Sequence, residues 1–190
     1  LKFALSIVAT AIMARLLTPQ DYGLVAMAAV ILNFVSMFKD LGLSFATVQR
    51  AEITDDQIST LFWVNVALSA AVLVVAVVIA PGVSWFYGEP RLTMITIVIA
   101  AGFVFSGLTV QHDALLRRQM KFFALSAIAL ISMISGYVVG IVLAWYGFGY
   151  WALVFSQLAL LLVGAIGVWT ACGWRPGLPK RNAGVGSMLA

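Results

Sequence analysis

Charge is scarce in this chain, and one long region has none. Asp, Glu, Lys and Arg make up 9% of the residues, against about 25% in ordinary soluble domains. Between Phe122 and Trp174 there is no Asp, Glu, Lys, Arg or His. A helix of roughly 20 apolar residues crosses the hydrocarbon core of a bilayer, and this region is long enough for two such helices. The missing charge therefore excludes a soluble domain and predicts an integral membrane protein.

Residues that carry chemistry are equally scarce. The chain has one histidine and one cysteine, and a lone Cys172 offers neither a disulfide nor a metal site. No HExxH, CxxC, Walker-loop or DxD-like motif occurs. The adjacent acids Asp55 and Asp56 fall in a capping-box pattern, Thr54-Asp-Asp-Gln57, which explains them as a helix start. The sequence therefore predicts no catalytic residues, no metal and no resident cofactor, and so a protein that is not an enzyme.

Long apolar runs are what the chain has instead. Hydrophobic residues make up 63% of it, and its mean hydropathy is +1.07. The runs are continuous and rich in Leu, Val, Ala and Ile, whereas membrane β-strands alternate apolar and polar residues. We therefore expect an all-α polytopic transmembrane bundle of about six helices in one lobe. The expected spans are 3–17, 19–38 (extending to about 50), 57–80, 91–114, 122–146 and 150–173.

Local signals set several of these boundaries. Thr18 followed by Pro19 predicts a helix start, with a hydroxyl N-cap and a proline at the first helical position. Pro81 and Gly82 are expected to end or kink the third span. The chain begins at Leu1 rather than Met, and its first span is short. We therefore expect a fragment that is cut inside or just before its first helix.

The basic residues are distributed unevenly between the two sides that these spans define. With a cytoplasmic N-terminus, Arg15 and Arg91 lie outside and nine of the eleven Lys and Arg residues lie inside: Lys2, Lys39, Arg50, Arg117, Arg118, Lys121, Arg175, Lys180 and Arg181. Basic residues in short loops favour the cytoplasmic side. The positive net charge of +4 is thus a topology signal rather than a nucleic-acid signal, because the basic residues are dispersed over separate loops.

Small residues form a stripe on the fifth span. Ser132, Gly136, Gly140 and Ala144 recur every fourth residue and therefore share one helix face. Such faces allow helix backbones to approach closely in lipid. The stripe is consistent with a dimerisation face or with packing inside the bundle, and we favour packing inside the bundle because the motif is common in membrane helices.

A few polar residues lie near the ends or inside the spans. Lys39 and Asp40 fit either an anchor at the inner interface or the lining of a water-filled cavity, since charges at membrane depth are costly elsewhere. Gln111 and Arg117 belong to a second polar cluster on the same side, again with the interface as the leading explanation. Asn65 shares a helix face with Ser69, and such groups more often bond neighbouring helices than ligands.

Three stretches resemble a known family. They are Ala14-Arg-Leu-Leu-Thr-Pro-Gln-Asp-Tyr-Gly-Leu-Val-Ala26, Asp40-Leu-Gly-Leu-Ser44 with Val48-Gln-Arg50, and Gln111-His-Asp-Ala-Leu-Leu-Arg-Arg-Gln-Met-Lys-Phe122. Together they resemble the bacterial polysaccharide transporter family, the O-antigen and exopolysaccharide flippases of the multidrug/oligosaccharidyl-lipid/polysaccharide exporter superfamily. The resemblance covers nearly the whole chain and implies most of the N-terminal lobe of a two-lobe transporter.

The resemblance implies a function. Members of this family move undecaprenyl-diphosphate-linked sugar repeat units across the bacterial cytoplasmic membrane for O-antigen, capsule or exopolysaccharide synthesis. The partners expected here are the lipid bilayer, that lipid-linked oligosaccharide and polysaccharide assembly proteins, with no nucleic acid. Candidate substrate-binding residues are Arg15, Lys39, Asp40, Arg50, Asn65, Gln111 and Arg117. Lys39 and Arg117 are expected to form a cationic cytoplasmic entrance for the pyrophosphate.

Coupling to H⁺ or Na⁺ would use a carboxylate, with Asp40 or Asp113 as the candidates. A multidrug antiporter of the same superfamily is the alternative within transport, and it would favour an acidic, aromatic-lined cavity. A membrane enzyme of envelope polysaccharide assembly is the alternative of another class, and it would place a large polar catalytic loop between spans.

Overall fold

The computed structural model describes residues 2–37 and 55–177, and every regular element in those two ranges is an α-helix. The all-α prediction is confirmed there. The helices are α1 (Lys2–Leu16), α2 (Pro19–Met37), α4 (Asp55–Tyr87), α5 (Arg91–Ala100), α6 (Gly102–Arg118), α7 (Phe122–Trp145) and α8 (Tyr150–Ala171). The expected continuation of the second span to residue 50 lies outside the described residues.

The predicted start of α2 is confirmed in detail. The Asp21 carboxylate accepts hydrogen bonds from the Thr18 backbone N–H at 3.0 Å and from the Thr18 hydroxyl at 2.7 Å. In return, the Thr18 hydroxyl oxygen accepts the Asp21 backbone N–H at 3.3 Å. This reciprocal pairing satisfies two donors that a helix N-terminus otherwise leaves unpaired, and it allows the chain to turn from α1 into α2 over two residues.

Pro81 and Gly82 were expected to end or kink the third span; they do not end it, and a kink there stays a prediction. α4 continues through Pro81 to Tyr87, and it ends before Gly88, whose φ of +69° suits glycine. A proline in a membrane helix leaves one carbonyl without its helical partner, and neighbouring groups in the protein can compensate for that loss. The glycine after Tyr87, not the proline, therefore marks the end of this helix.

The fourth span is divided at Ala101, which the sequence did not predict. α5 ends at Ala100 and α6 begins at Gly102. Gly102 is buried against α8, where an added Cβ would lie 2.7 Å from the Leu161 Cδ1. The break therefore lies at a point where this span packs tightly against a side chain of α8.

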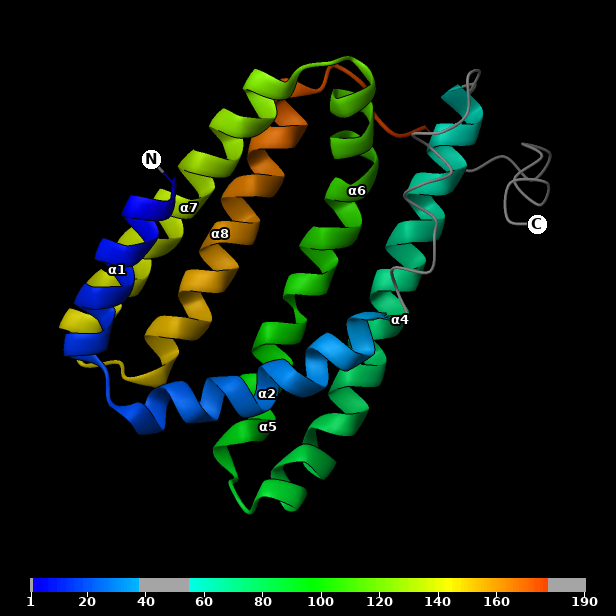
Figure 1. Ribbon diagram of the computed structural model, residues 1–190. Helices are drawn as coiled ribbons and strands as arrows, with labels where there is room; N and C mark the ends of the chain where they lie inside the picture. Colours follow the sequence, from blue (N-terminus) through cyan, green and yellow to red (C-terminus); the bar gives the residue numbers. More distant parts are fainter. Residues whose placement is uncertain (1, 38–54, 178–190) are drawn as a thin grey trace.

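Within residues 2–37 and 55–177, four segments are long and apolar enough to cross a membrane: Asp55–Tyr87, Arg91–Arg118, Phe122–Trp145 and Tyr150–Ala171. The chain is thus a multi-pass helical membrane protein. α1 is shorter, and α2 begins with Pro19, Gln20 and Asp21. In Figure 1, α4, α6, α7 and α8 run along the long direction of the molecule, whereas α2 lies across their lower part. Whether α1 and α2 each complete a crossing stays a prediction.

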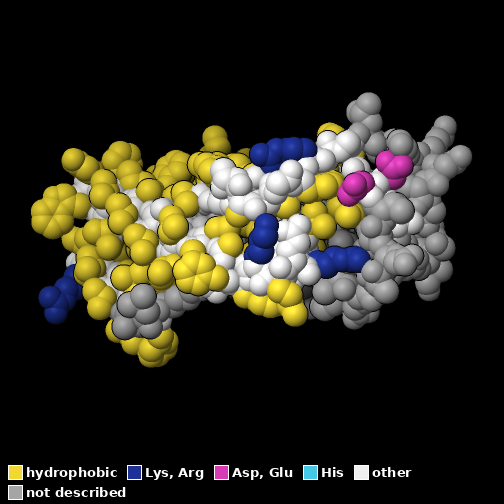
Figure 2. All heavy atoms as spheres, turned by 90° about the horizontal axis from the view of Figure 1, so that it is seen from above, with side chains coloured by type: hydrophobic (Ala, Val, Ile, Leu, Met, Phe, Trp, Pro, Cys, Tyr) yellow, Lys and Arg dark blue, Asp and Glu magenta, His cyan; other side chains and the backbone are white. Residues whose placement is uncertain are grey.

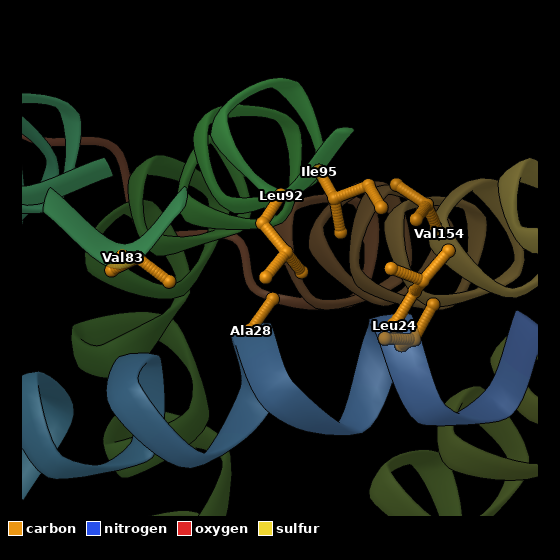
Figure 3. Packing of buried hydrophobic residues seen from close by; sticks show 7 residues of the cluster. Leu24, Ala28, Val83, Leu92, Ile95 and Val154 are labelled. Atoms are coloured by element: carbon orange, nitrogen blue, oxygen red, sulfur yellow. The ribbon is translucent and has the colours of Figure 1, made fainter. Parts of the chain in front are cut away.

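A buried apolar cluster holds α2 in this crossing position. Leu24 and Ala28 of α2 pack with Leu92 and Ile95 of α5 and with Val154 of α8, and Figure 3 shows their side chains converging between these helices. Leu92, Ile95 and Val154 have no exposed surface. α2 therefore fastens the ends of α5 and α8 that lie away from the α6–α7 turn.

The small-residue stripe of α7 packs inside the bundle, as the favoured interpretation predicted. Ser132, Gly136, Gly140 and Ala144 are the buried residues of this helix. A Cβ on Gly136 would lie 2.9 Å from the Ser156 carbonyl oxygen of α8, and one on Gly140 would lie 3.0 Å from the Met13 side chain of α1. α8 and α1 thus occupy this face, and a second copy of the chain has no access to it.

Replacing Gly136 by Leu should lower the abundance and the thermal unfolding temperature of the protein. The new side chain meets the α8 backbone, which cannot rotate away, and overpacking of this kind costs about 1–3 kcal/mol. Gly82→Leu is the matched control, because a Cβ on Gly82 meets nothing within 4 Å. Equal abundance and equal unfolding temperatures for the two variants would show that the α7–α8 approach is not tight.

Candidate functional site

Polar residues of α4 face α6 at a close helix–helix approach. Asn65 is 5% exposed and Ser69 is 2% exposed, and the Asn65 side-chain amide donates to the Leu61 carbonyl oxygen at 2.9 Å. On α6, a Cβ added to Gly107 would lie 2.6 Å from the Ser69 Cβ. Asn65, a predicted substrate contact, is therefore part of the packing between two helices.

Gln111 lies on the same helix pair, one turn beyond Gly107, and its side chain has no exposed surface. The next residue, His112, is also completely buried. Its ring stacks on Trp169 of α8 with centroids 4.3 Å apart and an interplanar angle of 23°. Both residues belong to the predicted polar cluster, but only Gln111 is a predicted substrate contact, and the rings around His112 come from distant segments of the chain.

Arg117 ends α6 in an ion pair. Its Nε donates to the Asp113 Oδ2 at 2.6 Å, and the two side chains are 57% and 38% exposed. Pairs with this much exposure contribute little to stability, about 0–1 kcal/mol. The pair therefore opens at little cost, which leaves a cation and a carboxylate available to a ligand.

A groove runs between α6, α7 and α8, and the Arg117–Asp113 pair lies on its rim. Its volume is about 320 Å³, at the lower end of the range for ligand pockets, about 300–1,000 Å³. The residues that line this α6–α7–α8 groove are Phe105, Thr109, Asp113, Arg117, Leu125, Ile128, Ala129, Ser132, Leu160, Leu161, Gly164, Ala165 and Val168.

The walls of the groove differ in character. α6 contributes Phe105, Thr109, Asp113 and Arg117, which recur every fourth residue and form one face of that helix. Polarity thus rises along α6 toward its last turn. The α7 and α8 walls are aliphatic apart from Ser132, whose hydroxyl donates to the Ile128 carbonyl oxygen at 2.7 Å. The groove is consequently apolar along α7 and α8 and polar along α6, with Asp113 and Arg117 lining it in the last two turns of that helix.

Basic side chains gather at the end of the molecule where the groove opens. Arg117 and Arg118 end α6, Lys121 precedes α7, and Arg175 follows α8. All four are exposed. Figure 2 views the molecule from above, with Lys and Arg side chains spread over the middle of this face and one flank that is almost entirely hydrophobic. We call these four residues the basic end.

The predicted binding residues do not all come together. Arg15 is exposed in the last turn of α1, at the end of that helix next to α2 and away from the basic end (Figure 1). Lys39, Asp40 and Arg50 lie outside the described residues. Asn65, Gln111 and Arg117 lie on the α4–α6 pair, and of these three Arg117 lines the groove. Over residues 2–37 and 55–177, no group of three or more His, Cys, Asp or Glu could hold a metal ion.

Known proteins similar to this chain have names that refer to polysaccharide synthesis. The chain is 27% identical to the succinoglycan biosynthesis transport protein ExoT of Rhizobium meliloti over 92% of its length and 35% of that protein. It is 26% identical to the lipopolysaccharide biosynthesis protein WzxC of Escherichia coli over 97% of its length and 38% of that protein. An uncharacterised membrane protein in the cps region of Klebsiella pneumoniae is 30% identical over 70% of this chain and 27% of its own length.

The family assignment comes from one further comparison. The chain spans about a third of the length of these relatives, and no solved structure matches it. A protein family described as "Polysaccharide biosynthesis protein" matches residues 12–190, which is nearly the whole chain and includes every helix from α2 onward. This chain therefore belongs to the polysaccharide biosynthesis protein family.

Proposed function

We propose that this protein is a transporter that moves undecaprenyl-diphosphate-linked sugar repeat units across the bacterial inner membrane. The observation that carries the proposal is the α6–α7–α8 groove, whose walls are aliphatic on α7 and α8 and which Arg117 lines in the last turn of α6. The proposed substrate has the same order of chemistry along its length, with an apolar chain, then a pyrophosphate, then polar sugars. Names of relatives that refer to transport and lipopolysaccharide biosynthesis support the same function.

The positive charges of the basic end are proposed to attract the pyrophosphate of the substrate. Attraction between a cation and a phosphate increases as water is excluded, and Arg–phosphate hydrogen bonds are among the strong ones. Arg117 is half-exposed and lines an apolar groove. The oxygens of a phosphate bound there would replace the Asp113 carboxylate as the hydrogen-bond partner of Arg117. Arg118 and Lys121 add positive charge nearby. In this proposal the substrate opens the Arg117–Asp113 pair when it binds.

The proposal favours one transport class over another. A multidrug antiporter would call for an acidic, aromatic-lined cavity, whereas the groove has one aromatic residue, Phe105, and a carboxylate that is already paired. Transport coupled to H⁺ or Na⁺ remains part of the proposal. Two carboxylates are candidates for binding the coupling ion, Asp113 and Asp40. Asp40 lies outside the described residues.

Removing the Arg117 charge should reduce export of the finished polysaccharide. A hydrogen bond to a charged group contributes about 1.5–3 kcal/mol, so we expect Arg117→Ala to reduce export about tenfold or more. Arg117→Lys should retain part of the activity, because it keeps the charge but loses the planar fork. The measurement is polysaccharide at the cell surface in a flippase-deficient strain carrying the full-length protein, divided by protein amount on an immunoblot.

Arg118→Ala is the matched control for this experiment. Arg118 is the neighbouring residue at the same helix end and is exposed, but it does not line the groove. We expect export by Arg118→Ala to fall by much less than export by Arg117→Ala, because Arg118 adds positive charge nearby but does not line the groove. Normal export by Arg117→Ala at normal abundance, or equal losses in the two variants, would contradict a specific role for Arg117.

The orientation of the bundle is also proposed, with the N-terminus and the basic end in the cytoplasm. Four cations of the basic end support it, since basic residues favour the inner side. Cysteines at Glu89 and Tyr146, in a Cys172→Ala background, should react with an impermeant maleimide in intact cells, whereas one at Gln119 should react only after permeabilisation. These positions avoid Gly88 and Gly147, whose φ values of +69° and +78° do not suit cysteine. The reverse labelling pattern would invert the topology.

A further inference from the structure

His112 is the centre of an aromatic cluster that no part of the proposed transport mechanism uses. Its ring stacks on Trp169 at 4.3 Å. Phe62 of α4 lies edge-on at 5.9 Å between centroids, and Trp174, which follows α8, lies edge-on at 5.3 Å. We call these four rings the His112 cluster. They join α4, α6, α8 and the segment after α8 at the basic end.

The imidazole of His112 is buried without hydrogen bonds to the rest of the described chain. It has no exposed surface, and among residues 2–37 and 55–177 neither its Nδ1 nor its Nε2 has a hydrogen-bond partner. The Leu108 carbonyl oxygen, one turn earlier on α6, accepts the Trp169 indole N–H at 3.0 Å and also lies near the His112 ring. A neutral imidazole has one donor and one acceptor, and leaving both unpaired in a core is unfavourable. A buried polar side chain without hydrogen bonds indicates a function other than stabilising the fold.

A short segment closes the cluster from the basic end. Residues 172–177, which we call the strap, leave α8 and cross to α4. The Trp63 indole N–H donates to the Gly177 carbonyl oxygen at 2.9 Å, and the Gly177 backbone N–H donates to the Ser59 hydroxyl oxygen at 3.1 Å. Two hydrogen bonds and the Trp174 ring therefore hold the strap on α4, over His112.

The charged and titratable groups around His112 are few. The strap contributes Arg175, whose guanidinium carbon lies 5.7 Å from the centre of the Trp169 ring and whose Nη1 donates to the Trp169 carbonyl oxygen at 2.8 Å. The strap also contributes the buried thiol of Cys172. On the same helix Asp113 is paired with Arg117 at the groove. On α4, Asp55 and Asp56 are exposed in the first turn. None of these carboxylates forms a hydrogen bond with either nitrogen of His112.

We propose that His112 is a proton-binding site, and that its proton releases the strap from α4. An imidazolium has two N–H donors and no acceptor, so the closed cluster cannot satisfy it. It would also put a second cation beside Trp169, where Arg175 already lies, and the two like charges repel. Moving the strap away lets water reach the imidazolium and separates the two cations.

The consequence is a proton-controlled contact between α4 and the end of α8. The neutral His112 keeps the strap closed, with Trp174 packed on Phe62 at 6.1 Å. The protonated His112 favours the open strap, which frees the first turns of α4 to move relative to α8. Release of the strap by a proton does not depend on which molecule the protein transports, because it involves one side chain and one segment of this chain.

The native Cys172 thiol reports whether the strap is open. Cys172 is 1% exposed and packs in a buried cluster with Trp174 at its edge. We would measure its alkylation rate by peptide mass spectrometry in the full-length protein in lipid nanodiscs, between about pH 8 and about pH 5, where a histidine changes charge. Dividing the rate of the wild type by that of His112→Phe at each pH removes the intrinsic pH dependence of the thiol reaction.

The ratio should rise several-fold as the pH falls, because Phe keeps the ring packing but cannot bind a proton. The same rise is expected when the rate of Asp113→Asn, in place of the wild-type rate, is divided by that of His112→Phe, since Asp113 faces the groove rather than the cluster. Trp63→Phe, which removes the hydrogen bond to Gly177, should raise the rate already at pH 8. A ratio that stays constant with pH would overturn the proposal. A rise abolished by Asp113→Asn would also overturn it, because the proton would then bind at Asp113.

Discussion

The structure depends most on the close packing around α8. Lipid provides no hydrophobic drive between helices, so they associate through contacts that bring their backbones together. α8 lies against α7 along the small-residue stripe, against α6 near Leu161, and against α2 and α5 through Val154. α7 and α6 thus both pack on α8, and the groove remains between them. The position of the groove follows from this arrangement.

Much of the fold could be predicted because membrane helices leave a simple signature. The uncharged run that begins at Phe122 predicted the start of α7, the aromatic and glycine residues from Trp145 to Trp151 predicted the turn before α8, and the Thr18–Pro19 pair predicted the start of α2. The path of α4 through Pro81 could not be predicted, since whether a proline ends a membrane helix depends on neighbouring groups that are distant in sequence. The break at Ala101 was not predicted either, since no proline or charged residue marks it, and the packing of Gly102 on Leu161 of α8 is visible only in the folded bundle.

The candidate site was predictable only in part. A charged residue at a helix end is visible in the sequence, and Arg117 does line the groove. The placement of Asn65 between α4 and α6 needed the partner helix, because a polar residue inside a span looks the same whether it faces a ligand or a neighbour. His112 was missed because its partners, Phe62, Trp169 and Trp174, are far apart in the sequence and meet only in the folded bundle. The complete burial of His112 marks it as unusual in the structure, and the burial of a side chain cannot be predicted from the identity of that residue alone.

The groove connects packing to the proposed transport, since it offers an apolar chain a path that ends beside a cation. Photocrosslinking tests this claim most directly: a sugar-bearing polyprenyl diphosphate with a photoreactive group on its chain is added to membranes that contain the full-length protein. Crosslinks should map to groove residues such as Thr109 of α6 or Ala129 of α7. Crosslinks confined to Ile131 and Val138 of α7, which are 56% and 54% exposed and do not line the groove, would contradict the account.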